Sequence, residues 1–256
     1  MARLAALYRY PVKGMSAEAV ETADLEIGGA IPHDRVLALA HGSTRFDPEA
    51  PEWMSKTNFF MLQRNERLAA LGVRFDPHSR VLTVSRDGRA VARGEVSTPV
   101  GRAVIEQFFG AYLADEARGA PRLVAAEGHV FMDVPGKTLS LINRASVKDL
   151  ERVAAAPVDP LRFRGNLLIE GAEPWAEFGW VGRELAIGQA RFRVPERINR
   201  CAAVNVDPVS AKRDLNLLKS LMTGYGHTDM GIYLEVIAPG RIAVGDEIRP
   251  VDTDPR

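Results

Sequence analysis

The sequence contains a single cysteine, Cys201, among its 256 residues. One cysteine excludes an internal disulfide, a cysteine-held iron–sulfur cluster, a four-cysteine zinc site and a CxxC redox pair. The sequence also lacks net charge, because 33 basic residues balance 33 acidic ones. No overall electrostatic field would attract DNA or an anionic membrane. We therefore expect no nucleic-acid partner.

Long hydrophobic runs are also missing. A transmembrane helix needs about 20 mostly apolar residues, and no such run occurs in the sequence. The amino end has only the short apolar segment Leu4–Tyr8 before Arg9, which is too short for the core of a secretory signal. We expect no membrane span and a cytoplasmic location.

Several well-known site motifs are absent. The run Gly136-Lys137-Thr138 resembles the end of a phosphate-binding P-loop, but Phe131 stands where that loop needs its first glycine. No GxGxxG, HExxH or GxSxG motif occurs, and the five histidines do not have the spacing of zinc ligands. A histidine-rich metal site and a serine-hydrolase site are therefore not expected.

Short apolar runs interrupted by Gly and Pro are the main feature that is present, and 46% of the residues are hydrophobic. Such runs predict many short strands rather than a helical bundle. The segments 81–84 and 89–92 flank Asp87-Gly88, a pair that favours a tight hairpin turn. At the carboxyl end, segments 232–237, 242–244 and 247–251 predict a terminal meander of the kind found in barrels.

Three helices are predicted. Thr98 can cap one that has Pro99 in its first turn, and Asn143 can cap a second. We expect a third to open at Asp207-Pro208. Segment 56–71 fits either a helix or a strand. The small and polar segment 115–121 is the best candidate for a linker, and it would divide the chain into unequal halves.

The surroundings of Cys201 are basic. Arg197 and Arg200 favour the thiolate, which is the form that attacks electrophiles and binds metals. A lone cysteine is more often a small buried apolar residue, so these residues alone leave both interpretations open. The excess of arginine over lysine, 27 to 6, also fits either a compositional bias or a need for forked anion donors.

Five motifs occur in the order found in a known family. They are Tyr10-Pro11-Val12-Lys13-Gly14, Pro32-His33-Asp34-Arg35, Arg162-Phe163-Arg164-Gly165-Asn166, Asn199-Arg200-Cys201 with Val206-Asp207-Pro208, and Gly231-Ile232-Tyr233 with Gly245-Asp246. From about Leu4 to Val251 the chain resembles MOSC-domain proteins with an amino-terminal β-barrel domain. This group includes the mitochondrial amidoxime-reducing component and its bacterial relatives.

The resemblance implies a β-rich α+β fold: a β-barrel-like MOSC N-terminal domain over residues 1–118 and a MOSC β-barrel domain with a few helices over 119–256. It also implies a molybdenum–molybdopterin cofactor in the cleft between them, with Cys201 as a sulfur ligand of the metal. Soft thiolates suit such a centre. The residues expected to bind the cofactor are Lys13, Arg35, Asn143, Ser146, Arg164, Asn166, Asn199, Arg200 and Tyr233.

The sequence departs from the family pattern at three places. Relatives often have Ser after the lysine and Trp two residues after the Asp-Arg pair, whereas this chain has Gly14 and Leu37. Relatives also tend to continue Val-Asp-Pro with an acidic residue, Thr and Gly, where this chain has 209–211 as Val-Ser-Ala. The cofactor is thus better indicated than any particular substrate.

By resemblance, the activity expected is a molybdenum-dependent oxidoreductase that reduces N-hydroxylated compounds such as amidoximes. Some bacterial relatives append a four-cysteine iron–sulfur domain, and the sequence ends at Arg256 without one. We expect electrons from an external donor protein, either a reductase or a carrier of ferredoxin or cytochrome type, and a small-molecule substrate. Two alternatives stay open: a carrier of cofactor or persulfide sulfur that uses Cys201, and a non-catalytic binding module with a structural cysteine.

Overall fold

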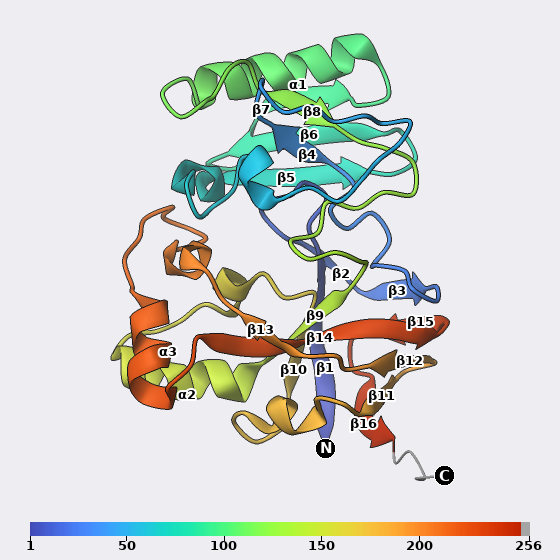
Figure 1. The fold of residues 1–256 in the computed structure, drawn as a ribbon, viewed down its shortest axis with the longest axis vertical. Coiled ribbons are helices and arrows are strands. Elements are labelled where there is room, and N and C mark those ends of the chain that lie inside the picture. Colours follow the sequence, from blue (N-terminus) through green and yellow to red (C-terminus); the bar gives the residue numbers. More distant parts are fainter. Residues whose placement is uncertain (252–256) are drawn as a thin grey trace.

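A closed barrel of seven strands fills the lower half of the computed structural model, which describes residues 1–251 (Figure 1). Its strands run in the order β10-β9-β14-β12-β11-β16-β1, and β1 pairs with β10 to close it. The bounds are β1 Ala2–Arg9, β9 Leu139–Asn143, β10 Leu167–Glu170, β11 Glu184–Ile187, β12 Ala190–Arg193, β14 Asp229–Ala238 and β16 Glu247–Val251. Closure leaves these strands without a free edge.

The first strand of the chain completes a barrel built mostly from the second half. In β1, Leu7 lies opposite Leu167 of β10, and Ala2 lies opposite Ile248 of β16. Inward-facing residues alternate along the strands and fill the interior with aliphatic side chains. Shorter strands add to the barrel or lie beside it: β2 (Glu18–Val20), β3 (Thr22–Leu25), β13 (Arg197–Asn199) and β15 (Gly240–Ala243).

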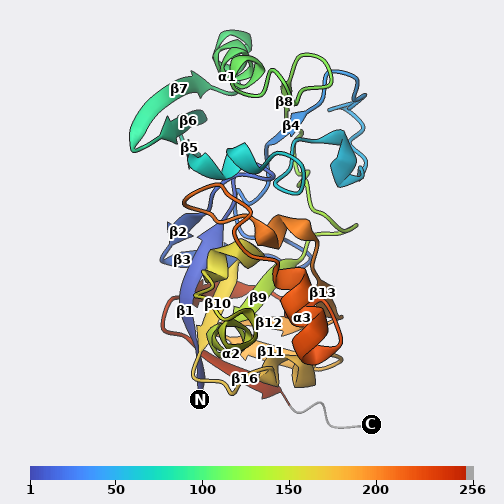
Figure 2. The same cartoon turned by 90° about the vertical axis from the view of Figure 1, so that its left-hand side faces the viewer.

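A second body lies above the barrel and is made by the middle of the first half (Figure 1, Figure 2). It holds the three-stranded sheet β5 (Leu71–Asp76), β6 (Val81–Arg86) and β7 (Arg89–Glu95), the pair β4 (Ala38–Ala40) and β8 (Arg122–Val124), and helix α1 (Pro99–Tyr112). The predicted hairpin is confirmed, because Asp87 and Gly88 join β6 to β7 with positive φ. Thr98 caps α1 as predicted, accepting a hydrogen bond from the Gly101 amide at 3.0 Å.

Two further helices pack together beside the barrel (Figure 1). Helix α2 (Arg144–Ala154) begins after Asn143 as predicted and connects the parallel strands β9 and β10. The predicted start of the third helix is wrong, since α3 (Leu217–Tyr225) is capped by Asn216. Asp207 instead closes a turn, because its carboxylate accepts hydrogen bonds from the amides of Val209 and Ser210.

The predicted terminal meander is also wrong, although its strands exist. Strand β15 pairs with β3, and β16 pairs with β11 and β1. Strand β14 pairs with β9 on one side and with β12 and β13 on the other, and its neighbours do not include β15. Segment 56–71 is neither a long helix nor a long strand. It contains two short 3-10 helices, η1 (Lys56–Asn58) and η2 (Glu66–Ala70). Three more 3-10 helices lie in the second half of the chain: η3 (Pro160–Phe163), η4 (Ala176–Trp180) and η5 (Ala202–Asn205).

The strand-rich structure, with three α-helices among residues 1–251, confirms the predicted β-rich α+β class. The domain border expected after residue 118 stays a prediction. In space, β8 follows that border and still pairs with β4 of the upper body. The longest α-helix in the described part is α1, with 14 residues. No helix among these residues has the length and apolar character needed to traverse a bilayer.

Candidate cofactor and substrate cavity

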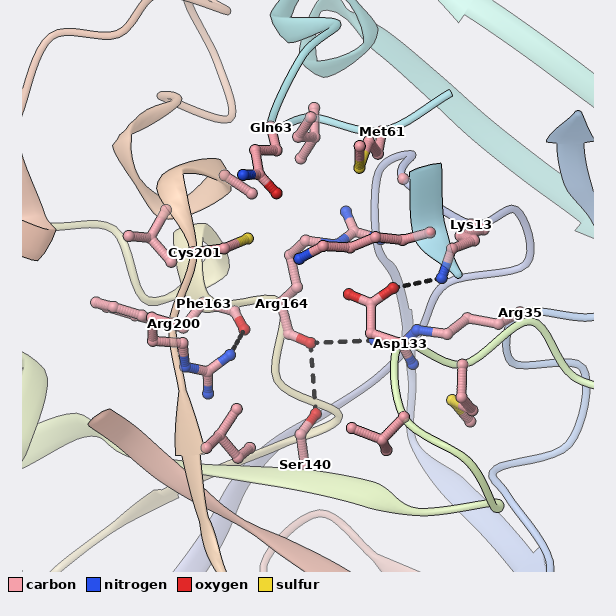
Figure 3. A pocket seen from close by; sticks show the side chains of 18 of the residues that line it. Lys13, Arg35, Met61, Gln63, Asp133, Ser140, Phe163, Arg164, Arg200 and Cys201 are labelled. Carbon is pink, nitrogen blue, oxygen red and sulfur yellow. Dashed lines mark hydrogen bonds and ion pairs between the residues drawn. The ribbon is translucent and has the colours of Figure 1, made fainter. Parts of the chain in front are cut away.

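A cavity of about 260 Å³ opens where the barrel meets the upper body. Its wall brings together segments that are far apart in the sequence, including the loops around residues 13, 35, 133, 164 and 201 and the segment 61–63 of the upper body (Figure 3). Eight of the ten residues expected at the site line it: Lys13, Arg35, Arg164, Asn166, Asn199, Arg200, Cys201 and Tyr233. The other two, Asn143 and Ser146, do not.

Cys201 lies between the end of β13 and the start of η5. Its carbonyl accepts a hydrogen bond from the Val204 amide at 3.2 Å, which fixes the turn that follows. The side chain is partly exposed, and its sulfur points into the cavity (Figure 3). It is therefore not the buried apolar cysteine that composition alone left open.

Tyr10 organises the cationic part of the cavity although it does not line it. Two guanidinium groups contact its buried ring, with Arg164 at 4.3 Å and Arg35 at 4.9 Å from the ring centroid. The hydroxyl donates to the carbonyl of Gly165 at 3.1 Å, which ties this end of β1 to the loop carrying Arg164. Burial raises the pKa of Tyr10 to about 12, so the ring stays uncharged.

Arg164 has a buried donor without a partner. It follows η3 in the left-handed region, with φ of 52°, and it lines the cavity. One terminal nitrogen, Nη1, donates to the carbonyl of Met15 at 2.5 Å, whereas the buried Nη2 has no hydrogen-bond partner. Burial lowers the pKa of Arg164. A bound anion would satisfy this donor and offset the cost of the buried charge.

Arg35 is held by the aspartate that precedes it. Asp34 is 1% exposed, forms an ion pair with Arg35 and accepts a hydrogen bond from the Tyr10 amide at 2.6 Å. Burial opposes the charge on Arg35, but the carboxylate of Asp34 outweighs it and raises the pKa of Arg35. A second nitrogen of Arg35 donates to the carbonyl of Arg164 at 3.4 Å. The Asp-Arg motif therefore supplies a fixed cation.

Lys13 is a buried cation, only 4% exposed. Its ammonium group donates to the carbonyl of Phe131 at 2.9 Å and is paired with the carboxylate of Asp133 (Figure 3). Burial lowers the pKa of Lys13, and Asp133 opposes that shift. Asp133 is 59% exposed, so it stands at the mouth of the cavity.

Arg200 and Asn199 line the cavity, but their side chains donate hydrogen bonds to other groups of the protein. Arg200 donates to the carbonyl groups of Phe163 and Met230, both at 2.8 Å, and burial lowers its pKa to about 10. Asn199 donates to side-chain oxygens of Thr228 and Asp229. These bonds hold the strand before Cys201 against its neighbours, so both residues act first as supports for the cysteine.

Asn166 and Tyr233 also line the cavity. Asn166 exchanges hydrogen bonds with Ser140, including a 3.0 Å bond from the Ser140 hydroxyl to the Asn166 amide oxygen. This pairing joins the start of β9 to the loop that precedes β10. Burial raises the pKa of the Tyr233 phenol, which lines the cavity from β14, although the charge of Arg200 opposes the shift.

Asn143 and Ser146 lie elsewhere, and this departs from the sequence-based expectation. Both side chains donate to the carboxylate of Glu177, which is completely buried, at 2.8–2.9 Å. The Asn143 side chain also accepts from the Ala145 amide and caps α2. Polar residues at a helix start can cap the helix, bind a buried carboxylate or bind a ligand, and the sequence alone does not distinguish these roles.

Several cavity residues were not expected from the sequence, among them Asp133 and Gln63. Neither belongs to a motif, and both come from segments of irregular structure, so no local signal indicated them. Within residues 1–251 no group of three or more His, Cys, Asp and Glu side chains could hold a metal ion. Among the residues that line the cavity, Cys201 carries a thiol that could serve as a metal ligand.

Comparison with known families divides the chain in two. The model of the MOSC N-terminal beta barrel domain matches residues 1–118, and the model of the MOSC domain matches residues 128–249. Together they cover nearly the whole chain. The protein therefore belongs to the MOSC-domain proteins that also carry the MOSC N-terminal domain.

The curated relatives are matched over part of their length. The human protein "Mitochondrial amidoxime-reducing component 1" is 32% identical over 120 residues, covering 42% of this chain and 35% of that protein. "Molybdenum cofactor sulfurase" of Danio rerio is 35% identical over 108 residues, covering 37% of this chain and 13% of that protein. Among solved structures, the YUAD protein from Bacillus subtilis aligns over 96% of this chain and 93% of its own, with a TM-score of 0.45 and 13% identity.

Proposed function

We propose that the cavity binds a molybdenum–molybdopterin cofactor with Cys201 as a ligand of the metal, and that the protein reduces N-hydroxylated compounds. The observation that carries this proposal is the combination of a partly exposed thiol and several cations in one cavity. The name of the human relative, an amidoxime-reducing component, gives the proposed substrate class.

The residues present fit such a cofactor. A pterin that ends in a phosphate needs cations and free donors. Arg164 offers a buried Nη2 without a partner, and Lys13 and Arg35 are fixed beside it by carboxylates. At the other end the thiol of Cys201 supplies a soft ligand. Tyr10 holds two of the cations in a fixed geometry.

When bound, the molybdenum would supply two-electron oxygen-transfer chemistry. The overall reaction breaks the N–O bond of an N-hydroxylated compound: R–NH–OH, two electrons and two protons give R–NH2 and water. The chain would anchor the metal through Cys201 and hold the phosphate through its cations. Its single cysteine cannot hold an iron–sulfur cluster, so we assign the electrons to a separate donor protein, either a reductase or a carrier of ferredoxin or cytochrome type.

The test is expression in a host that makes the cofactor, followed by metal and pterin analysis and an assay of benzamidoxime reduction with an artificial electron donor. We expect about one molybdenum and one pterin per chain. We also expect reductase activity in the wild-type protein and none in Cys201→Ser. Protein that is free of molybdenum and pterin after such expression would overturn it.

A second function is supported by the matches to molybdenum cofactor sulfurases. In this alternative, Cys201 carries a persulfide or the protein passes on cofactor without redox turnover. A partly exposed cysteine thiol suits this role as well. Metal-free protein that releases sulfur on cyanide treatment would favour the carrier, whereas molybdenum-loaded protein with reductase activity would favour the enzyme.

A further inference from the structure

The side chain of Gln63 has a buried acceptor that nothing in the protein satisfies. Its amide oxygen Oε1 is buried and accepts no hydrogen bond, and the residue lines the cavity from the upper body. In Figure 3 the amide group lies above Cys201, on the side away from Lys13. A buried acceptor without a partner is costly, and such a group in a cavity wall calls for a functional explanation.

The cavity has two chemically different ends. Lys13 and Arg35 mark the cationic end, with Arg164 between it and the cysteine (Figure 3). Around the cysteine the lining comes from both bodies. It combines the apolar Leu62, Ile198, Ala203 and Val204 with Asn199 and Arg200, whose donors are already bonded to the protein. Gln63 is the uncharged polar group of the upper wall here, so this end suits a neutral molecule that can donate a hydrogen bond.

Arg213 fixes the distance between Gln63 and the cysteine loop. Its guanidinium group donates to the carbonyl groups of Leu62 at 3.0 Å and Gln63 at 2.8 Å, and to the carbonyl of Ala202 at 2.9 Å. It also pairs with Glu66 at 2.8 Å. Ala202 directly follows Cys201, so one side chain ties the upper wall to the residue next to the thiol.

We propose that Gln63 recognises the substrate by accepting a hydrogen bond from its N–H or O–H group, and that Arg213 is the positioning residue for this contact. The inference rests on the proposed function and adds the residue that selects the substrate. It assigns specificity to neutral N-hydroxylated compounds that carry a donor. Compounds without a donor, such as tertiary amine N-oxides, would leave Oε1 unsatisfied.

The test compares Gln63→Leu, which keeps the size of the side chain and removes its acceptor, with the wild-type holoprotein. We expect unchanged molybdenum and pterin content and a KM for benzamidoxime that rises roughly tenfold with a smaller change in kcat. The kinetic constants for a tertiary amine N-oxide should stay within about twofold of wild type, since no hydrogen bond is lost. In the absence of an electron donor, calorimetry on the oxidised holoprotein should give the same roughly tenfold loss of benzamidoxime affinity.

Arg213 is tested by Arg213→Ala and Arg213→Lys, with exposed Arg144→Ala as the matched control. If Arg213 positions Gln63, Arg213→Ala should have a higher KM for benzamidoxime and an unchanged molybdenum content. Arg213→Lys should restore the KM only in part, because lysine lacks the planar fork of the guanidinium group. If Arg213→Ala does not fold, Gln63→Leu still decides the proposal.

The outcomes separate this inference from the function on which it rests. Wild-type protein without molybdenum or without reductase activity would overturn the proposed function. A Gln63→Leu variant with wild-type KM and affinity, or one that loses the same factor on the N-oxide, would overturn the inference alone. Loss of molybdenum from Gln63→Leu would also overturn it, because Gln63 would then bind the cofactor.

Discussion

The buried ammonium group of Lys13 is paired with the carboxylate of Asp133 at the mouth of the cavity. Lys13 and Asp133 are 120 residues apart in the sequence. The Asp133 carboxylate places a negative charge at the cationic end of the cavity. Burial by itself would raise the pKa of Asp133, but the charges of Lys13 and Arg35 lower it below its usual value. The carboxylate therefore stays ionised at neutral pH and competes with any other anion for these cations.

Asp133→Asn should strengthen anion binding. The change removes a negative charge next to Lys13 and keeps a polar side chain of similar size. We expect the affinity of the cofactor-free protein for inorganic phosphate to rise roughly fivefold, the equivalent of about 1 kcal/mol. Calorimetric titration measures this, with exposed Asp115→Asn as the control. Equal or weaker phosphate binding by Asp133→Asn would show that Asp133 does not compete for the site.

Arg164→Gln should reduce cofactor retention. It removes a buried charge and the unpartnered Nη2 while keeping a polar side chain. We expect the molybdenum and pterin content after purification to fall by at least about tenfold, since charge-assisted hydrogen bonds contribute about 1.5–3 kcal/mol. The exposed Arg144→Gln variant serves as control. Full molybdenum content in Arg164→Gln would exclude this arginine from the cofactor site.

Local signals in the sequence predicted local structure well. The Asp87-Gly88 turn and the caps at Thr98 and Asn143 were confirmed because each depends on neighbouring residues alone. The errors came where distant contacts decided the outcome. Asp207 carries a helix-start signal, yet the buried Arg162 binds its carboxylate and a turn forms in place of a helix.

The candidate site was predictable to the extent that motifs encode it. Lys13, Arg35, Arg164 and Cys201 stand in motifs, and the structure brings them into one cavity, while their roles stay predictions. Gln63 carries no motif signal and enters the site only because the upper body folds over the barrel. No spacing of residues in the sequence predicts that Gln63 lies at the cavity.

Glu177→Gln should change how stability depends on pH. Burial raises the pKa of Glu177, although hydrogen bonds from Asn143 and Ser146 oppose the shift. The folded state therefore binds this proton more tightly than the unfolded state, whose ordinary pKa is 4.5. Between that value and the raised pKa the contribution of Glu177 to stability is lost as pH rises.

The measurement is urea unfolding of wild type and Glu177→Gln from pH 4 to pH 8. We expect the fall in the wild-type unfolding free energy with rising pH to be smaller in the variant. Exposed Glu173→Gln should keep the wild-type dependence. Parallel curves for wild type and Glu177→Gln would mean that Glu177 has no raised pKa in the folded protein.

Gly14→Ser should destabilise this protein even though relatives often have serine at the equivalent place. Gly14 has φ of 78°, and a Cβ atom there would lie 2.9 Å from the carbonyl oxygen of Phe60. The left-handed backbone costs a non-glycine residue about 1–2 kcal/mol, and the contact adds to it. We expect the free energy of unfolding to fall by about 2–3 kcal/mol. Gly28→Ser is the matched control, since Gly28 has φ of 62° with no atom within 4 Å of the added Cβ.

The difference between the two variants measures the contact with Phe60. Because Phe60 directly precedes the wall residues 61–63, the same strain should displace that wall. We therefore expect Gly14→Ser, but not Gly28→Ser, to raise the KM for benzamidoxime as well. Equal stability of the two variants would mean that the backbone around Phe60 yields freely and that the glycine is needed for its φ alone.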